Sequence, residues 1–490
     1  MSRRFQLDSE SRRQLGNRLV QHIDRYFESL PDRSVQLPES ERSFAELHDA
    51  IPEVGADAQR VLDELCAELI DTGFHVPAAN YFGLMNPTPT YTGVLAEMLV
   101  AALNPQLATM ARSQLASKIE QETVRWIAER VGWKKSFGGT FTSGGNEANF
   151  SALALALTAK FPHVMDDGVQ SIDASPVMYV SSEAHHSLDK SAGLLGLGRK
   201  CVRRIPVSRR IQMEAGQVEK AIVGDVAAGQ LPFCVVATAG TTNSGAIDDI
   251  AAIAEVCRRH DIWLHVDGAY GAAAVFSDKH RRLVQGIELA DSITVDPHKW
   301  LAMPFAAGVV LTRHPELLKQ TFGVATPYMP RVNVPLPPDN FAISTQWTRR
   351  MNSLKLWLTL RVHGRLAYEE HIDRQIQLAR WFEQRIEGSE HFELFAKPML
   401  PIFNLRIKGS SDDEAESSQL HQAIVDEVTR DGRQWISTTR VAGHTVIRVM
   451  IISYLTEQRH LEQLLARLHA AAEKLLLTGT RHAAFPTTQK

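Results

Sequence analysis

Short apolar runs alternate with helical patterns between about residues 137 and 313, and this alternation limits the folds open to the chain. Near-continuous apolar strands separated by helices predict a mainly parallel sheet that is covered by helices. Ligands of such sheets bind at the carboxyl ends of the strands. We therefore predict an α/β fold with strands at VMYVSS and at residues 201–207, 233–240, 262–267, 292–296 and 308–313, and helices at 146–159 and 250–260.

The chain is expected to divide into several packed units, because its 490 residues exceed the size at which a single hydrophobic core stops growing. Amphipathic helical patterns precede the alternating region. After it, a long helical stretch leads into three strand-like runs, ELFAKP, IFNLRIKG and VIRVMIISY. We predict an N-terminal helical segment at 1–80, a large domain at 81–360, a small α+β domain at 361–478 and a tail at 479–490.

Charge and cysteine content exclude several classes of protein. Lysine plus arginine number 53 and aspartate plus glutamate 56, so the net charge of −3 leaves no basic excess for nucleic acid or an anionic membrane. The four cysteines are far apart and form no zinc-ligand pattern, so we expect reduced thiols and no metal site. No apolar stretch has the pattern of a signal peptide or a membrane span, which predicts a cytoplasmic protein.

Two stretches of small and polar residues follow apolar runs and suit a bound ligand. FTSGGNEAN (141–149) has a glycine pair before a helix, which leaves backbone N–H groups free to bind a phosphate. A simple glycine turn, capped by Asn146 or Ser143, is the alternative. In LHVDGAYG (264–271), Asp267 ends a strand, where its carboxylate can hold a protonated ring nitrogen or a metal, or simply cap the next turn.

Two further strand ends carry a lysine and a pair of histidines. In SITVDPHKWLAMP (292–304), Lys299 lies between apolar runs, where its amine could attack a carbonyl, although most lone lysines are solvated surface residues. In SSEAHHSLDKSAGLLGLG (181–198), His185 and His186 follow a strand, where a neutral imidazole can stack on an aromatic ligand or have only a structural role. Together the four motifs provide a phosphate cradle, an acid for a pyridine nitrogen, an amine for an aldehyde and a ring for stacking. These are the contacts that pyridoxal 5′-phosphate needs.

The motifs resemble those of the group II pyridoxal-phosphate-dependent amino-acid decarboxylases, which include aromatic-L-amino-acid, glutamate and diaminobutyrate decarboxylases. The resemblance extends from about residue 75 to about residue 465, and its most specific parts are HVDGAYG, VDPHKWL and the closing IRVMIISYLTEQRHLEQLL. It implies the pyridoxal-phosphate-dependent transferase-like fold of type I, with an N-terminal helical segment that dimerises, a large cofactor-binding domain around a mainly parallel sheet of the seven-stranded type, and a small C-terminal domain. It also implies a homodimer with active sites at the subunit interface.

The resemblance implies a role for each site residue. Lys299 forms a Schiff base with the cofactor, Asp267 pairs with the pyridinium nitrogen, and His185, in preference to His186, stacks on the ring. These three are the expected catalytic residues. The other expected cofactor contacts are Ala269 against the ring, Thr242 near the ring hydroxyl, and Gly144, Gly145, Asn146 and His298 around the phosphate.

The implied reaction is decarboxylation of an L-amino acid to the corresponding amine and CO2. In relatives, a loop tyrosine returns a proton to the substrate's Cα, and phenylalanine in its place gives aldehyde synthases, which decarboxylate and deaminate with O2. Here the loop has Tyr328 at its start and Phe341 near the position of that tyrosine, so aldehyde formation is the alternative. The substrate stays open, because the positions that are aromatic in relatives with aromatic substrates carry Leu84, Met85, Asn86, Gln106, Ala108 and Met110.

Overall fold

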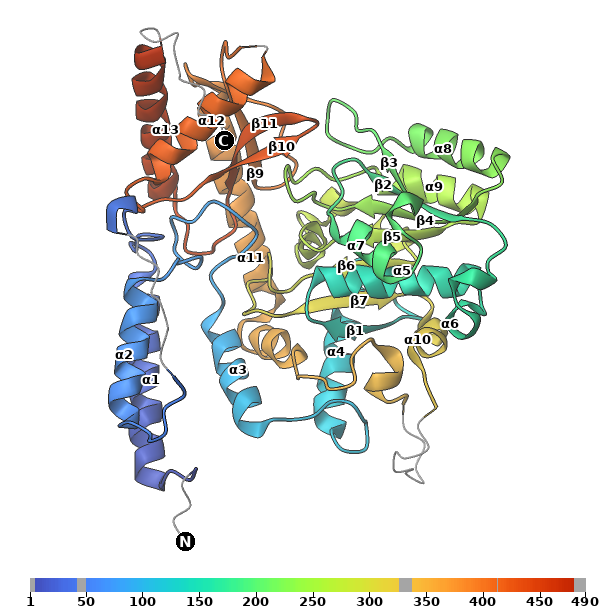
Figure 1. Ribbon diagram of the computed structural model, residues 1–490, viewed down its shortest axis with the longest axis horizontal. Coiled ribbons are helices and arrows are strands. Elements are labelled where there is room, and N and C mark those ends of the chain that lie inside the picture. The colour runs from blue at the N-terminus through green and yellow to red at the C-terminus, as the bar shows by residue number, and fades with distance from the viewer. Residues whose placement is uncertain (1–4, 42–49, 326–336, 412, 480–490) are drawn as a thin grey trace.

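Two sheets organise the chain in the computed structural model, which describes residues 5–41, 50–325, 337–411 and 413–479 (Figure 1). A seven-stranded sheet forms one half of the molecule and a four-stranded sheet lies in the other. The long helix α11 (Ser353–Glu387) runs between the two halves and bends at Gly364, whose φ is 75°. The expected domain boundary between residues 360 and 361 falls inside this helix, and the four domain ranges stay a prediction.

The large sheet has the strand order β1-β7-β6-β5-β4-β2-β3, and all its strands are parallel except β7, which runs antiparallel to both neighbours. This confirms the predicted α/β fold and each predicted strand of the sheet. The prediction omits β1, because its two glycines weaken the β pattern. The strands are β1 (Gly138–Thr142), β2 (Pro176–Ser181), β3 (Val202–Ile205), β4 (Leu231–Thr238), β5 (Trp263–Asp267), β6 (Ser292–Val295) and β7 (Gly308–Thr312).

Helices cover both faces of this sheet, which explains why its strands are apolar on both sides. One hydrophobic core lies between the sheet and α4, α8 and α9, and another lies between the sheet and α5, α7 and α10. The α5 helix crosses the second face and contacts β4, β5, β6 and β7. The bounds of these helices are α4 (Gln114–Val131), α5 (Gly145–Lys160), α7 (Ser187–Leu194), α8 (Ala215–Ala227), α9 (Ile250–His260) and α10 (Pro315–Phe322).

The small sheet is antiparallel, with the order β10-β11-β9-β8. Its strands are β8 (Phe392–Leu394), β9 (Ile402–Ile407), β10 (Ser437–Val441) and β11 (His444–Met450), and the helices α12 (Glu414–Thr429) and α13 (Gln458–Gly479) pack beside it. The sequence pattern predicts β8, β9 and β11. It misses β10, an edge strand whose residues, STTRV, are mostly polar and only partly buried.

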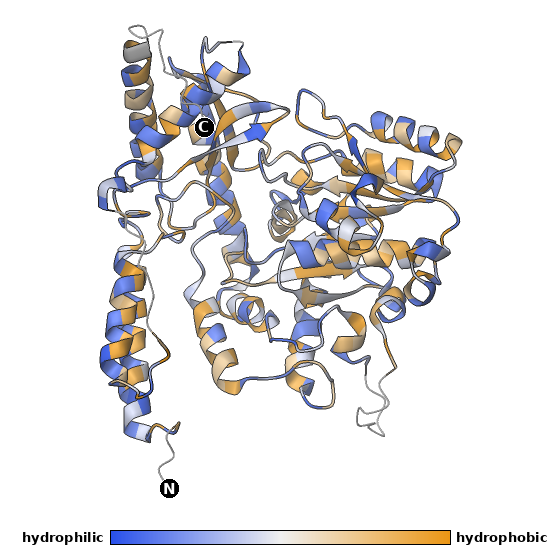
Figure 2. Ribbon diagram, in the orientation of Figure 1, coloured by the Kyte–Doolittle hydropathy of each residue, from blue (hydrophilic) through white to orange (hydrophobic). Residues whose placement is uncertain are grey.

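Two helices near the N-terminus, α1 (Ser9–Ser29) and α2 (Ala58–Asp71), pack against each other and bury no residue within the rest of the chain. Figure 2 shows hydrophobic and hydrophilic residues alternating around both helices. On α2, Val61, Leu65 and Leu69 are exposed. The next helix, α3 (Tyr91–Leu103), packs on α11. None of the described helices is long and apolar enough to cross a membrane.

A buried ion pair fastens the first strand of the large sheet. Nη2 of Arg349 lies 2.7 Å from Oε1 of Glu120, and the two side chains are only 1% and 3% exposed. The same guanidinium donates to Oγ1 of Thr140 and to the carbonyl of Phe141, both in β1. Since Phe141 is followed closely by the glycine pair, this contact fixes the position from which the 143–146 turn begins.

We expect Glu120→Gln to lower the free energy of unfolding by about 3 kcal/mol or more, because it leaves the Arg349 charge buried without its counterion. Glu122→Gln on the same helix is the control, since its exposed ion pair with Arg125 is worth about 1 kcal/mol or less. The measurement is the urea midpoint at fixed protein concentration with saturating cofactor. Equal midpoints for the two variants would contradict this role.

Candidate active site

All nine residues predicted to bind the cofactor line one cavity of about 320 Å³ at the carboxyl ends of the parallel strands. The polar residues come from the ends of β4 and β5 and from the segments that follow β1, β2 and β6. Sequence segments more than 150 residues apart therefore meet here, since Gly144 and Lys299 line the same space. The lining residues are Gly144, Gly145, Asn146, His185, Thr242, Asp267, Ala269, His298 and Lys299.

The turn between β1 and α5 forms one end of the cavity. Gly144 is the N-cap of α5 and provides no side-chain hydrogen bond to the helix. Among the described residues, none accepts a hydrogen bond from the backbone N–H groups of Gly145 and Asn146. Free N–H groups at the start of a helix bind anions, so this end of the cavity can hold a phosphate.

Glycine is required at position 145 by a close approach. A Cβ atom there would lie 2.7 Å from Oδ2 of Asp296 and 3.3 Å from Cβ of Ala269. Any side chain would displace one of these residues or the turn itself. His298 lies on the other side of the turn, and its Nδ1 accepts a hydrogen bond from the N–H of Ala307 at 3.0 Å. Its proton is therefore on Nε2, and burial lowers its pKa.

The Asp267 carboxylate is buried and hydrogen-bonded on both oxygens. Nδ2 of Asn149 donates to Oδ2 at 2.9 Å, and the N–H of Ala269 donates to Oδ1 at 3.2 Å. The side chain lies at the end of β5, next to Thr238 of β4 in the sheet register. A carboxylate held in this way is positioned to accept a hydrogen bond from a protonated ring nitrogen.

A chain of hydrogen bonds supports Asn149 from behind. Because the Nδ2 of Asn149 faces a carboxylate, its Oδ1 faces His265 and accepts from Nε2 at 3.1 Å. Nδ1 of His265 lies 2.9 Å from the hydroxyl oxygen and 3.1 Å from the carbonyl oxygen of Ser292, and that hydroxyl oxygen accepts from the indole N–H of Trp263. Burial lowers the pKa of His265 to about 4, so the ring is neutral.

His185 lies open to the cavity after β2. Its Nδ1 accepts a hydrogen bond from the N–H of Ser187 at 3.1 Å, so the proton is on Nε2. Burial lowers the pKa of His185, and the negative charge of the nearby Asp267 carboxylate opposes this shift. A neutral ring fixed by one backbone contact can stack on a flat ligand. The neighbouring His186 does not line the cavity.

Lys299 forms the third side of the site. Its Nζ lies 3.0 Å from Oδ2 of Asp296, and its side chain is 23% exposed while that of Asp296 is 1% exposed. The other oxygen of Asp296, Oδ1, has no hydrogen-bond partner among the described residues. The amine thus lies in the cavity with a buried counterion beside it.

The end of the predicted loop reaches the rim of the cavity. Gln346 donates to both carboxylate oxygens of Glu147, at 2.9 and 2.8 Å, and Glu147 lines the cavity. Phe341, a candidate for the position of the family's tyrosine, does not line the cavity but stacks on Trp347 with ring centroids 4.6 Å apart. Tyr328 lies outside the described residues.

Sequence reasoning missed the residues that support the predicted ones. Asn149 was visible only as a polar residue in an apolar helix, and His265 as part of the motif around Asp267. One signal could have identified Asn149, since it lies four residues after Gly145 and thus on the helix face above that glycine.

Comparison with known proteins identifies the family. The family described as "Pyridoxal-dependent decarboxylase conserved domain" matches residues 38–408. The chain belongs to this family. Membership confirms the predicted cofactor, pyridoxal 5′-phosphate, and the predicted class of enzyme, a pyridoxal-phosphate-dependent amino-acid decarboxylase, which is a carboxy-lyase.

Individual family members differ in the reactions that their names state. The chain is 31% identical over 482 residues to the aromatic-L-amino-acid decarboxylase of Bacillus atrophaeus, covering 98% of this chain and 99% of that protein. It is 26% identical to the 4-hydroxyphenylacetaldehyde synthase of Rhodiola rosea, covering 94% of each. The crystal structure of mouse CSAD superimposes with a TM-score of 0.88 at 26% identity, covering 95% of this chain and 99% of that one.

The cavity fits the cofactor of this decarboxylase family. It has free N–H groups and a close-packed glycine turn at one end, a fixed carboxylate at another and an amine between them. These suit, in turn, a phosphate, a pyridine nitrogen and an aldehyde.

We expect Gly145→Ala to raise the Kd for pyridoxal 5′-phosphate about tenfold or more, which corresponds to about 1.4 kcal/mol, because the new Cβ would collide with Asp296. Gly216→Ala is the control, since a Cβ at that position in α8 meets no atom within 4 Å. Titration of the apoprotein, followed by the visible absorption of the bound cofactor, measures both. A Kd within twofold of the unchanged protein would show that the turn tolerates a side chain.

Proposed function

We propose that the protein decarboxylates an L-amino acid to the corresponding amine and CO2, with Lys299 as the residue that binds the cofactor covalently. The observation that carries this proposal is the convergence of Lys299, Asp267 and His185 on one cavity with the α5 turn at its end. In the reaction, the bond between Cα and the carboxylate breaks, CO2 leaves, and a proton takes its place on Cα.

When bound, pyridoxal 5′-phosphate supplies an aldehyde that condenses with amines and a ring that accepts the electron pair of the breaking bond. The N–H groups of Gly145 and Asn146 and the Nε2–H of His298 would hold its phosphate, and Ala269 and Thr242 would bound the ring. In this arrangement the Lys299 amine, which lies 3.0 Å from the carboxylate of Asp296, would be the group that condenses with the aldehyde.

Asp267 would keep the ring nitrogen protonated. Its two oxygens already accept hydrogen bonds from Asn149 and Ala269, which fix the direction of the carboxylate. A positive ring nitrogen next to a fixed negative charge draws electrons more strongly than a neutral one. The neutral ring of His185 would stack on the opposite side of the ring from Ala269.

The amine product is proposed over the aldehyde because of Phe341. Phe341 is packed on Trp347 and does not line the cavity of its own chain, which supports a role for it in packing. Tyr328 stays the candidate for the residue that donates the proton to Cα. Among the six positions predicted to contact the substrate, only Met85 lines the cavity. It gives the cavity a flexible apolar side chain on its lining.

We also propose that two copies of the chain pair through the N-terminal helices. The helices α1 and α2 bury no residues, and apolar side chains on α2 and α3 are exposed. A folded monomer rarely exposes this many apolar side chains on neighbouring helices. A second copy would cover them. The exposed apolar residues of these two helices are Val61, Leu65, Leu69, Leu95, Met98, Leu99 and Leu103.

A screen of L-amino acids for CO2 release tests the proposed reaction. The panel holds aromatic, acidic and diamino acids, and amine, ammonia and hydrogen peroxide are measured beside CO2. We expect CO2 and amine in equal amounts from one class. Release of CO2 with ammonia and peroxide would assign the aldehyde reaction instead, and no CO2 from any member of the panel would reject both. Lys299→Ala serves as the control, because it should lose turnover together with the cofactor adduct that borohydride reduces.

We expect Asp267→Asn to lower kcat at least about 100-fold while the cofactor still binds, because the amide cannot hold the ring nitrogen in its protonated form. The visible absorption of the bound cofactor checks that binding is retained. Asp291→Asn is a matched control, since that carboxylate directly precedes β6 of the same sheet but lies outside the cavity. Near-normal kcat for Asp267→Asn would refute the proposed role.

A further inference from the structure

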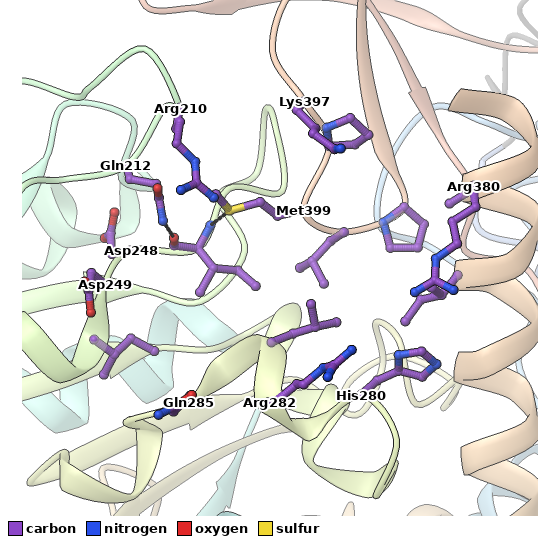
Figure 3. A pocket seen from close by; sticks show the side chains of 18 of the residues that line it. Arg210, Gln212, Asp248, Asp249, His280, Arg282, Gln285, Arg380, Lys397 and Met399 are labelled. Atoms are coloured by element: carbon purple, nitrogen blue, oxygen red, sulfur yellow. Dashed lines mark hydrogen bonds between the residues drawn. The ribbon is translucent and has the colours of Figure 1, made fainter. Parts of the chain in front are cut away.

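A second cavity, of about 710 Å³, lies between the two halves of the molecule, and none of the nine predicted site residues lines it (Figure 3). One wall consists of loops beside the large sheet, at residues 210–212, 247–251 and 280–285. The other wall consists of α11 and the segment 397–401, which leads into β9. A ligand in this cavity would touch both halves at once.

Three arginines from three separate elements point into this interdomain cavity. Arg210 lies between β3 and α8, Arg282 in the short turn Arg281–Val284, and Arg380 on α11. Figure 3 shows their side chains directed from three sides into the space between the walls. Within residues 5–41, 50–325, 337–411 and 413–479, no group accepts a hydrogen bond or an ion pair from any of the three guanidiniums. Their N–H donors are thus available to a ligand.

Three carboxylates also line this cavity. Oε1 of Glu383 lies 3.9 Å from Nζ of Lys397, which is a fourth cation of the lining, and it accepts no hydrogen bond from the described residues. Burial raises the pKa of Glu383, and the charges of Lys397 and Arg380 oppose this rise. Asp249 caps α9 by accepting from the N–H of Ala252 at 3.1 Å. Asp248 is buried and accepts from two backbone N–H groups, at 2.7 Å each. The four cations of the lining, Arg210, Arg282, Arg380 and Lys397, thus outnumber its three carboxylates by one, although the chain as a whole has a net charge of −3.

Apolar side chains also line the cavity. Aliphatic and thioether side chains come from both walls, so the apolar area continues from one half of the molecule to the other. A cavity with an apolar floor and a few convergent charged groups is typical of sites for small organic ligands. The apolar lining residues are Ile247, Ile250, Leu283, Ile376, Met399 and Leu400.

We propose that the interdomain cavity binds a small organic polyanion. Its apolar body lies on the aliphatic floor, and two or more phosphate or carboxylate groups bind Arg210 and Arg282 on one wall and Arg380 on the other. Guanidinium groups bind both kinds of anion through paired, charge-assisted hydrogen bonds. The placement of the three arginines on two walls therefore calls for a ligand that carries at least two anionic groups and spans the cavity. The proposal concerns binding alone and does not depend on which amino acid the enzyme decarboxylates.

Isothermal titration calorimetry of the holoenzyme at low salt tests this site with three probes. ADP carries a diphosphate on a nucleoside, citrate carries carboxylates, and adenosine is the uncharged control. We expect ADP or citrate to bind with one site per chain and adenosine not to bind. The double variant Arg282→Gln/Arg380→Gln should raise the Kd by about tenfold or more. Comparison of ADP with citrate separates a phosphate ligand from a carboxylate ligand.

Arg210→Gln and Arg209→Gln form a matched pair. Both remove one positive charge from the same exposed segment, but only Arg210 lines the cavity. We expect Arg210→Gln to weaken binding and Arg209→Gln to change the Kd less than twofold. The visible absorption of the cofactor should be unchanged in every variant, which confirms that each is folded. Absence of binding by both anions, an unchanged Kd in the double variant, or equal effects of Arg209→Gln and Arg210→Gln would overturn the proposal.

Discussion

The hydrogen bond from Asn149 to Asp267 is the contact on which the site depends. A buried carboxylate is costly, and it stays charged only where fixed donors replace the water that it has lost. Asn149 provides one of these donors, and it can do so only if α5 crosses the face of the sheet with its first turns beside the end of β5. The apolar face of α5, the glycine turn before it and the support of His265 all serve the same arrangement. The helix that begins at the expected phosphate site is thus the helix that holds the expected acid.

The topology of the large sheet explains why distant segments meet. Five neighbouring strands run parallel, so their carboxyl ends lie along one edge, and the residues after each strand are gathered there. The antiparallel β7 begins where the others end, and Gly308 at its start lies against the glycine turn, since a Cβ there would come within 2.5 Å of Cα of Gly144. The same strand thereby joins β1 to the parallel strands and supports the turn.

Sequence patterns predicted the parts of this structure that follow from local chemistry. Alternating apolar runs predicted the strands of the large sheet, apart from β1, and the polar residues at strand ends predicted which side chains would share a cavity. The hydrogen-bond partners could not be predicted in this way, because the contact between Asn149 and Asp267 joins residues 118 positions apart and depends on how α5 crosses the sheet. The cavity between the two halves was missed for the same reason. Arg210, Arg282 and Arg380 have no common motif and come together only through packing.

The neutral state of His265 has a consequence for how the enzyme responds to acidity. Its pKa of about 4 lies well below neutrality, so the ring stays neutral at every pH from mildly acidic to alkaline. Were this histidine to gain a proton at neutral pH, its extra charge would pull on the carboxylate and compete with the ring nitrogen for it. Because the ring is neutral over this range, the charge that surrounds Asp267 from behind does not change with pH.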